Sequence, residues 1–137
     1  MKVGDYEPRF DFKVDLQYGH QAEQNLIDFF SAVNNNLVEV KSDRYRNGRM
    51  IVETQQKPPG QDWKNSGINV TTAQWWAYQL APDSFILVSV KRLRKFLSMN
   101  SFMLEKRDFA YEGDNPTRGF LLSSSEVHEL QTSRAYD

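Results

Sequence analysis

Two short runs of alternating apolar and polar residues, joined by a polar stretch that contains Asn47-Gly48, constrain this chain more than any other feature. The runs cover residues 37–43 and 50–55. Alternation with a period of two is typical of half-buried strands, and Asn-Gly between two such runs favours a tight turn. The sequence therefore predicts a β-hairpin over residues 37–55, with its apolar side chains facing a core.

The length of the turn decides which polar side chains of this hairpin share a face. A two-residue turn at Asn47-Gly48 would set Asp43 opposite Val52, an acid against an apolar group. A three-residue turn with Gly48 in the left-handed conformation pairs Lys41 with Glu53 instead. We expect the second register, because it gathers the polar groups on one face, with Asp43 diagonal to Glu53.

This polar face has two interpretations. Polar faces on hairpins are commonly just solvated. However, two carboxylates on neighbouring strands with an amine beside them could bind a magnesium ion, polarise a phosphate and position a water. Residues outside the hairpin must decide between the two.

Composition limits the class of protein. The chain has 137 residues, 39% of them hydrophobic, which suits one folded domain. It has no cysteine and two histidines, so disulfides, thiolate zinc sites and histidine-rich metal sites are not expected. The first ten residues lack an apolar run and no stretch approaches a membrane span, so we expect a cytoplasmic protein without a membrane partner.

The basic residues are clustered, although the net charge is only -1. Local basic patches can bind a phosphate backbone even on a chain that is nearly neutral overall. Each patch taken singly is equally well explained as a solvated surface. The candidate nucleic-acid contacts are Arg44, Arg46 and Arg49 near the turn, and Lys91, Arg92, Arg94 and Lys95 farther along the chain.

The rest of the chain gives a coarse order of elements. Apolar spacing and capping signals predict helices over residues 20–34, from Thr71 or Thr72 to 80, over 90–99, and after a capping box at Ser123 to Glu126. Strands are expected at 85–90 and 119–122. We expect an extended segment within 1–18, a loop over 100–118 and a frayed tail over 131–137.

Several short motifs occur in a characteristic order. They are Gly19-x-x-x-Glu23, Glu39-Val40-Lys41-Ser42-Asp43, Gly48 to Glu53, Ser66-Gly67-Ile68 with Thr71 or Thr72, and Trp75-Trp76. Together they resemble small phage-type nucleases of the PD-(D/E)XK superfamily, over most of residues 19–90 and more weakly over 118–122. The resemblance implies a single α/β domain over residues 1–137. Its restriction-endonuclease-like core, a mixed β-sheet flanked by helices in αβββαβ order, would cover about residues 19–90, with additions at 91–131.

The resemblance also implies an activity, a metal-dependent endonuclease that hydrolyses phosphodiester bonds in DNA. Asp43 matches the motif aspartate, Glu53 the first acid of the Glu-x-Lys element, and Glu23 the helix acid beside the metal. These three would bind Mg²⁺, with Mn²⁺ as a substitute. The chain departs from the pattern at the lysine position, where Gln55 stands. Lys41 from the adjacent strand could supply the missing amine, so both complete the predicted catalytic set.

Other interpretations stay open at this point. Glu39-Val40-Lys41 is itself a literal Glu-x-Lys, but the segment before it lacks an aspartate on a strand, so we prefer Asp43 and Glu53. The departure at Gln55 also fits a nucleic-acid-binding module that lost cleavage. A protein-interaction domain that uses the tryptophan segment as an interface is a third alternative. A homodimer is compatible with all three.

Overall fold

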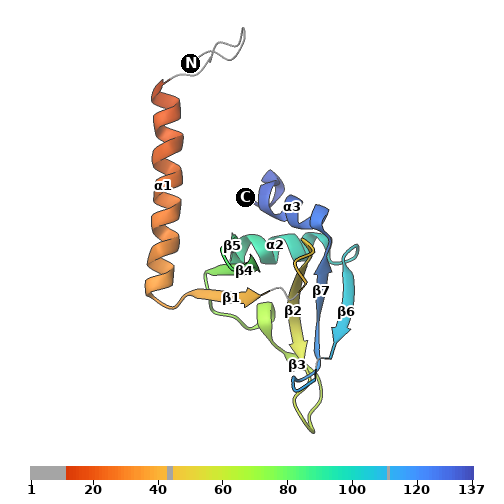
Figure 1. Ribbon diagram of the computed structural model, residues 1–137. Helices are drawn as coiled ribbons and strands as arrows, with labels where there is room; N and C mark the ends of the chain where they lie inside the picture. The colour runs from red at the N-terminus through yellow and green to blue at the C-terminus, as the bar shows by residue number, and fades with distance from the viewer. Residues whose placement is uncertain (1–11, 43–44, 111) are drawn as a thin grey trace. The chain divides into compact units, whose positions relative to one another are not determined.

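The computed structural model describes residues 12–42, 45–110 and 112–137 (Figure 1). Within them the fold is mixed α/β, as expected, with three α-helices and two sheets. None of the described helices is long and apolar enough to cross a membrane. The elements are α1 (Phe12–Asn34), β1 (Val38–Ser42), β2 (Met50–Gln56), β3 (Lys64–Asn65), the 3₁₀ turn η1 (Gly67–Asn69), β4 (Trp75–Ala81), β5 (Ser84–Ser89), α2 (Val90–Asn100), β6 (Glu105–Phe109), β7 (Thr117–Leu122), α3 (Ser124–Thr132) and the 3₁₀ turn η2 (Arg134–Tyr136).

The chain divides into two compact units, Met1–Asn35 and Asn36–Asp137. In the first unit, the predicted helix over 20–34 is confirmed, but α1 already begins at Phe12, and Gly19 lies inside it. The extended segment expected within 1–18 is therefore wrong for residues 12–18. Phe12 and Leu16 alternate with polar residues but are also four apart, so the same apolar residues fit the helical period.

The second unit contains two sheets. One has the order β1-β4-β5, with β1 parallel to β4 and β4 antiparallel to β5. The other has the order β3-β2-β7-β6 and is antiparallel throughout. The Tyr78 hydroxyl on β4 accepts a hydrogen bond from the Ile51 amide on β2 at 3.3 Å, which joins the two sheets.

The predicted hairpin is wrong, because β1 and β2 lie in different sheets. Lys41 is aligned with Tyr78 on β4, not with Glu53, and β2 pairs with β7 and β3. Gly48 does adopt a left-handed conformation, with φ of +76°. Alternating apolar residues correctly indicated two strands, but they did not specify the strand partner or, for β1, the buried face. Met50 and Val52 of β2 are buried as expected, whereas Val40 of β1 is 62% exposed.

The predicted helix from Thr71 or Thr72 to 80 is also wrong, because these residues form β4. Trp76, Ala77 and Tyr78 are all buried, and β4 is the central strand of its sheet, so its sequence is apolar without alternation. The Thr71 hydroxyl accepts from the Ala73 amide at 3.2 Å and stabilises a turn before the strand.

Several other expectations have clear outcomes. The strands near 85–90 and 119–122 and the helix near 90–99 are confirmed as β5, β7 and α2. The capping box is confirmed at α3, where Ser123 and Glu126 exchange hydrogen bonds of 2.9 and 3.2 Å. The predicted loop over 100–118 contains β6, and the tail expected to fray forms η2 with a buried Tyr136.

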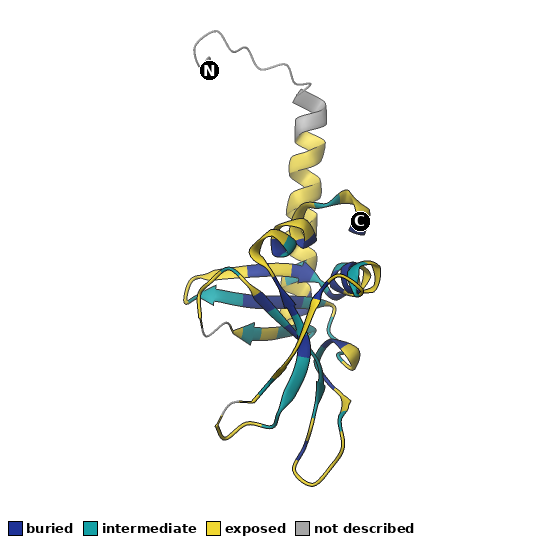
Figure 2. Cartoon of the chain, turned by 90° about the vertical axis from the view of Figure 1, so that its right-hand side faces the viewer, coloured by how far each residue is buried: buried dark blue, intermediate teal, exposed yellow. Residues whose placement is uncertain are grey.

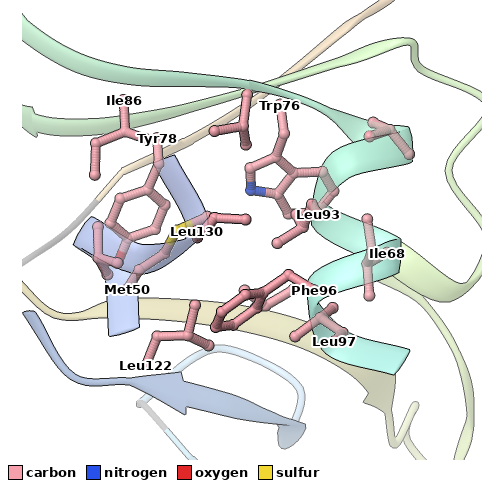
Figure 3. Packing of buried hydrophobic residues seen from close by; sticks show 14 of the residues in the cluster. Met50, Ile68, Trp76, Tyr78, Ile86, Leu93, Phe96, Leu97, Leu122 and Leu130 are labelled. Atoms are coloured by element: carbon pink, nitrogen blue, oxygen red, sulfur yellow. The ribbon is translucent and has the colours of Figure 1, made fainter. Parts of the chain in front are cut away.

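The core lies where the two sheets meet α2 and α3, and burial is concentrated there (Figure 2). Figure 3 shows Trp76 and Tyr78 of β4 pointing toward side chains from α2, β2 and β7. The largest fully buried side chains are Trp76, Phe96, Met50, Leu93, Leu122, Leu130 and Val52. This core fixes β2 and β7, and so sets the position of the residues described next.

Candidate nucleic-acid interface

Glu53 lies half-buried on β2, in the interior of the four-stranded sheet. The turn at Ser66-Gly67 packs directly on its backbone, and the Ser66 amide donates to the Thr54 carbonyl at 2.9 Å. Gly67 has φ of +54°, and a Cβ atom there would lie 2.2 Å from the Glu53 carbonyl oxygen. Among the described residues, no side chain or amide donates a hydrogen bond to the Glu53 carboxylate.

Glu53 of β2, Gly119 of β7 and Arg107 of β6 lie in one row across the sheet. Glu53 is aligned with Gly119, and Gly119 with Arg107 of β6. Residues aligned in this way share a face of the sheet. Gly119 has no side chain, and a Cβ there would lie 2.3 Å from the Val52 carbonyl oxygen. The acid and the guanidinium therefore face the same side, roughly 10 Å apart at their backbones.

Lys41 is not beside Glu53. Its ammonium lies 3.4 Å from the Glu39 carboxylate on the same strand and 5.8 Å from the centre of the Trp76 ring. Both charged side chains are about one-third exposed, 36% and 37%, so the ion pair is weakly stabilising. The catalytic role predicted for Lys41 through pairing with Glu53 thus loses its geometric basis.

Gln55 accepts a hydrogen bond from Arg118 at 3.4 Å. Arg118 also binds Asp108 in a fork, at 2.8 and 3.2 Å, and lies 4.0 Å from the centre of the Trp63 ring. The hydrogen bond from Arg118 lowers the pKa of Asp108, against an opposing effect of burial. Gln55 is therefore part of a side-chain network that ties β2 to β7 and β6.

The remaining members of the predicted metal site cannot be placed beside Glu53. Asp43 and Arg44 lie outside the described residues, and Glu23 belongs to the other unit, on α1. Within the described ranges, no group of three histidine, cysteine, aspartate or glutamate side chains could hold a metal ion. Glu53 offers one carboxylate without a protein partner there, so a metal site at Glu53 needs Asp43 as well.

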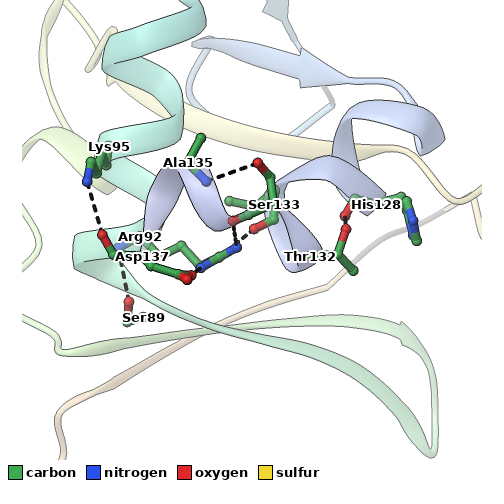
Figure 4. Close-up of polar contacts among 9 residues, drawn as sticks. Ser89, Arg92, Lys95, His128, Thr132, Ser133, Ala135 and Asp137 are labelled. Atoms are coloured by element: carbon green, nitrogen blue, oxygen red, sulfur yellow. Dashed lines mark hydrogen bonds and ion pairs between the residues drawn. The ribbon is translucent and has the colours of Figure 1, made fainter.

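Arg92 and Lys95 of the predicted basic cluster bind the C-terminal end of the chain (Figure 4). Arg92 donates to the carbonyl oxygens of Leu130 at 2.6 Å and of Ser133, and to the Asp137 carboxylate at 2.7 Å. Lys95 donates to the Asp137 backbone oxygen at 3.0 Å. Their side chains thus stabilise the end of α3 and the η2 turn.

Arg94 has a similar structural role, because it donates to the carbonyl oxygens of Ile68 and Thr71 at 2.8–3.3 Å. Lys91 is exposed. A nucleic-acid role for these four cations stays a prediction, but three of them already make internal bonds that explain why they are there.

The sequence did not indicate the most suggestive surface of the molecule, which we call the basic-aromatic pocket. Its volume is about 330 Å³. It lies over the face of the four-stranded sheet that carries Ile51, and Arg107 and Phe109 reach it from β6. Residues 105–109 are mostly charged and were expected to form a loop, so nothing in the sequence indicated that Arg107 and Phe109 line a pocket. The pocket is lined by Tyr45, Asn47, Arg49, Ile51, Arg107, Phe109 and Leu121.

A second, wider hollow of about 750 Å³ adjoins the exposed strand β6. It is lined in part by Lys106, Arg107 and Arg118, with Asp108 among them. The Lys106 ammonium lies 5.9 Å from the centre of the Phe120 ring. Arg107 at the edge strand lines both hollows, which otherwise take alternate residues of β6 and so lie on opposite faces of the sheet.

Comparison with known proteins does not assign the chain to a family. No protein-family model, curated protein or solved structure matches the chain. Glu53, the basic-aromatic pocket and the surface between them are therefore the features that bear on the function.

Proposed function

We propose that the protein is a metal-dependent nuclease that hydrolyses phosphodiester bonds in DNA. The observation that carries the proposal is the row Glu53, Gly119, Arg107, in which a carboxylate without a protein partner in the described part of the chain faces the same side as a guanidinium. Phosphate needs cations to bind it, and a metal-assisted attack on it needs carboxylates nearby.

Glu53 also adjoins the basic-aromatic pocket. Ile51 is two residues from Glu53 on the same face of β2 and lines that pocket, so about 7 Å of strand separates the two. Asp43, the second ligand that the resemblance implies, lies outside the described residues.

In this proposal, Asp43 and Glu53 would hold Mg²⁺ or Mn²⁺, and the guanidinium groups of Arg49 and Arg107 would bind a phosphate of the strand next to the cut. A bound divalent cation would supply activation of water and neutralisation of charge on the phosphate oxygens. The role of Glu23 stays a prediction from the resemblance, because Glu23 belongs to the other unit. The restriction-endonuclease-like core is part of the proposal only, because β1 and β2 lie in different sheets and β4 follows where a helix was expected.

The direct test is cleavage of labelled supercoiled and linear duplexes, a flap, a four-way junction and single strands, with Mg²⁺ or Mn²⁺. We expect cleavage that requires the metal and is lost in Glu53→Gln, a change that keeps the size of the side chain but removes its charge. Glu112→Gln removes an exposed acid elsewhere and should cut like the wild type. Metal-independent cleavage, or equal cleavage by Glu53→Gln, would overturn the proposal.

A second candidate is a nucleic-acid-binding module without cleavage. The observation that favours it is the position of Gln55, which stands where the Glu-x-Lys element has its lysine and is bound by Arg118. Among the described residues, Lys41 does not replace that amine beside Glu53. This candidate predicts that DNA is bound equally well with and without metal and is never cut.

A further inference from the structure

The basic-aromatic pocket combines apolar, aromatic and basic side chains. Its floor is apolar, formed by Ile51 and by Leu121, which is 6% exposed. Tyr45 and Phe109 contribute aromatic rings, and Tyr45 is 61% exposed. Flat ring systems such as nucleobases stack on aromatic side chains of this kind.

The charged part of the pocket is suited to phosphate. Among the described residues, nothing accepts a hydrogen bond from the Arg49 guanidinium, whereas its own amide donates to the Asn47 side-chain oxygen at 3.0 Å. Arg107 pairs with Glu105 at 3.1 Å, but the two side chains are 47% and 52% exposed. An ion pair this exposed adds little stability, so a phosphate can replace the Glu105 carboxylate as the partner of Arg107.

We propose that this pocket binds one unstacked nucleotide of a single strand, with its base against Tyr45 and Phe109 and its phosphate on Arg49 and Arg107. A volume of about 330 Å³ lies at the lower end of the range of small-ligand sites and suits a single nucleotide. A base inside a duplex cannot reach such a pocket unless it leaves the stack. The Asn47 amide, whose oxygen is held by the Arg49 backbone, keeps its NH₂ group for the edge of the base.

This inference deepens the proposed function and rests on it for its biological meaning, since it names the substrate class as single-stranded or branched DNA with unpaired nucleotides. The second hollow lies across the edge strand β6, because Lys106 points to the opposite face of the sheet from Arg107. A strand that leaves the pocket past Arg107 reaches Lys106 by passing round this exposed edge.

The test measures binding without cleavage, by fluorescence anisotropy of a labelled oligo-dT strand and of a duplex of equal length, with EDTA present. We expect the single strand to bind more tightly. Tyr45→Ala should weaken it by roughly 5- to 150-fold, the range for loss of one stacked base. Arg49→Gln should weaken it as well, by loss of a phosphate contact. Tyr45→Phe keeps the ring and should restore most of the affinity.

Arg134→Gln is the control, because Arg134 is an exposed arginine of η2 that does not line the pocket and is not among the candidate nucleic-acid contacts. Loss of affinity equal to that of Arg49→Gln would mean unspecific attraction to charge and would overturn the inference, as would equal binding of duplex and single strand. Unchanged thermal unfolding of each variant separates loss of binding from loss of fold. Because no metal is present, the outcome is independent of whether Glu53 supports cleavage.

Discussion

Substituting Gly67 by alanine should show how tightly the η1 turn is built onto the strand that carries Glu53. Two costs add at this position. The backbone φ of +54° is one that an L side chain adopts only with strain, of about 1–2 kcal/mol. The new Cβ would also lie 2.2 Å from the Glu53 carbonyl oxygen and 2.9 Å from its carbon, and both of these are backbone atoms that cannot rotate away.

Forced overlap of this kind in a packed region costs about 1–3 kcal/mol. We therefore expect Gly67→Ala to lower the free energy of unfolding by about 2–5 kcal/mol in total. The chain offers a matched control in Gly60, which has φ of +69° but no atom within 4 Å of the position of a Cβ. Gly60→Ala should show the backbone strain alone, about 1–2 kcal/mol.

Urea unfolding followed by tryptophan fluorescence measures both variants, since all three tryptophans, Trp63, Trp75 and Trp76, lie in the unit that contains Gly60 and Gly67. The result that would refute the argument is an equal loss in the two variants. The turn would then not rest on the Glu53 backbone, and the position of Glu53 would not depend on it.

Three further predictions concern the stability of the same unit. Arg92→Ala removes the charged donor that caps the end of α3 and should cost about 2–4 kcal/mol, while the exposed neighbour Lys91→Ala should change stability by less than about 0.5 kcal/mol in the same urea assay. Burial raises the pKa of the Tyr136 hydroxyl, so the unfolded chain ionises first and stability falls as the pH rises above about 10; Tyr136→Phe should lose less stability in that range, measured by thermal unfolding against pH. The hydroxyl of Ser66 is buried without a hydrogen-bond partner in the described residues, so Ser66→Ala should leave the melting temperature unchanged or raise it.

Local signals in the sequence were reliable where a few adjacent residues decide the structure. Ser123 and Glu126 specify the start of α3 by themselves, and Ser89 caps α2 by accepting from the Arg92 amide. Such bonds span three residues, so no distant part of the chain can change them. The helix over 20–34 had the same advantage, since its apolar spacing is local as well.

Strand pairing depended on residues far apart, and there the prediction failed. Val38 of β1 is aligned with Trp75, a residue that lies well beyond β2 in the chain, and nothing in the alternation of β1 indicates that partner. The sequence of β6, Glu-Lys-Arg-Asp-Phe, is mostly charged because the strand lies at an edge, so it lacks an apolar pattern. The sequence motif pointed to Glu53, but Arg107 could be placed on the same face of the sheet only once the pairing of β6 with β7 was known.

The central claim is that Glu53 and Asp43 bind a divalent metal next to a surface for nucleic acid. Titration of Mn²⁺ into the metal-free protein, followed by electron paramagnetic resonance of the free ion, tests it without any substrate. The account predicts that the wild type binds Mn²⁺ and that Glu53→Gln and Asp43→Asn each abolish the binding, whereas Glu112→Gln does not. Equal Mn²⁺ binding by the wild type and both site variants, or none by the wild type, would contradict it.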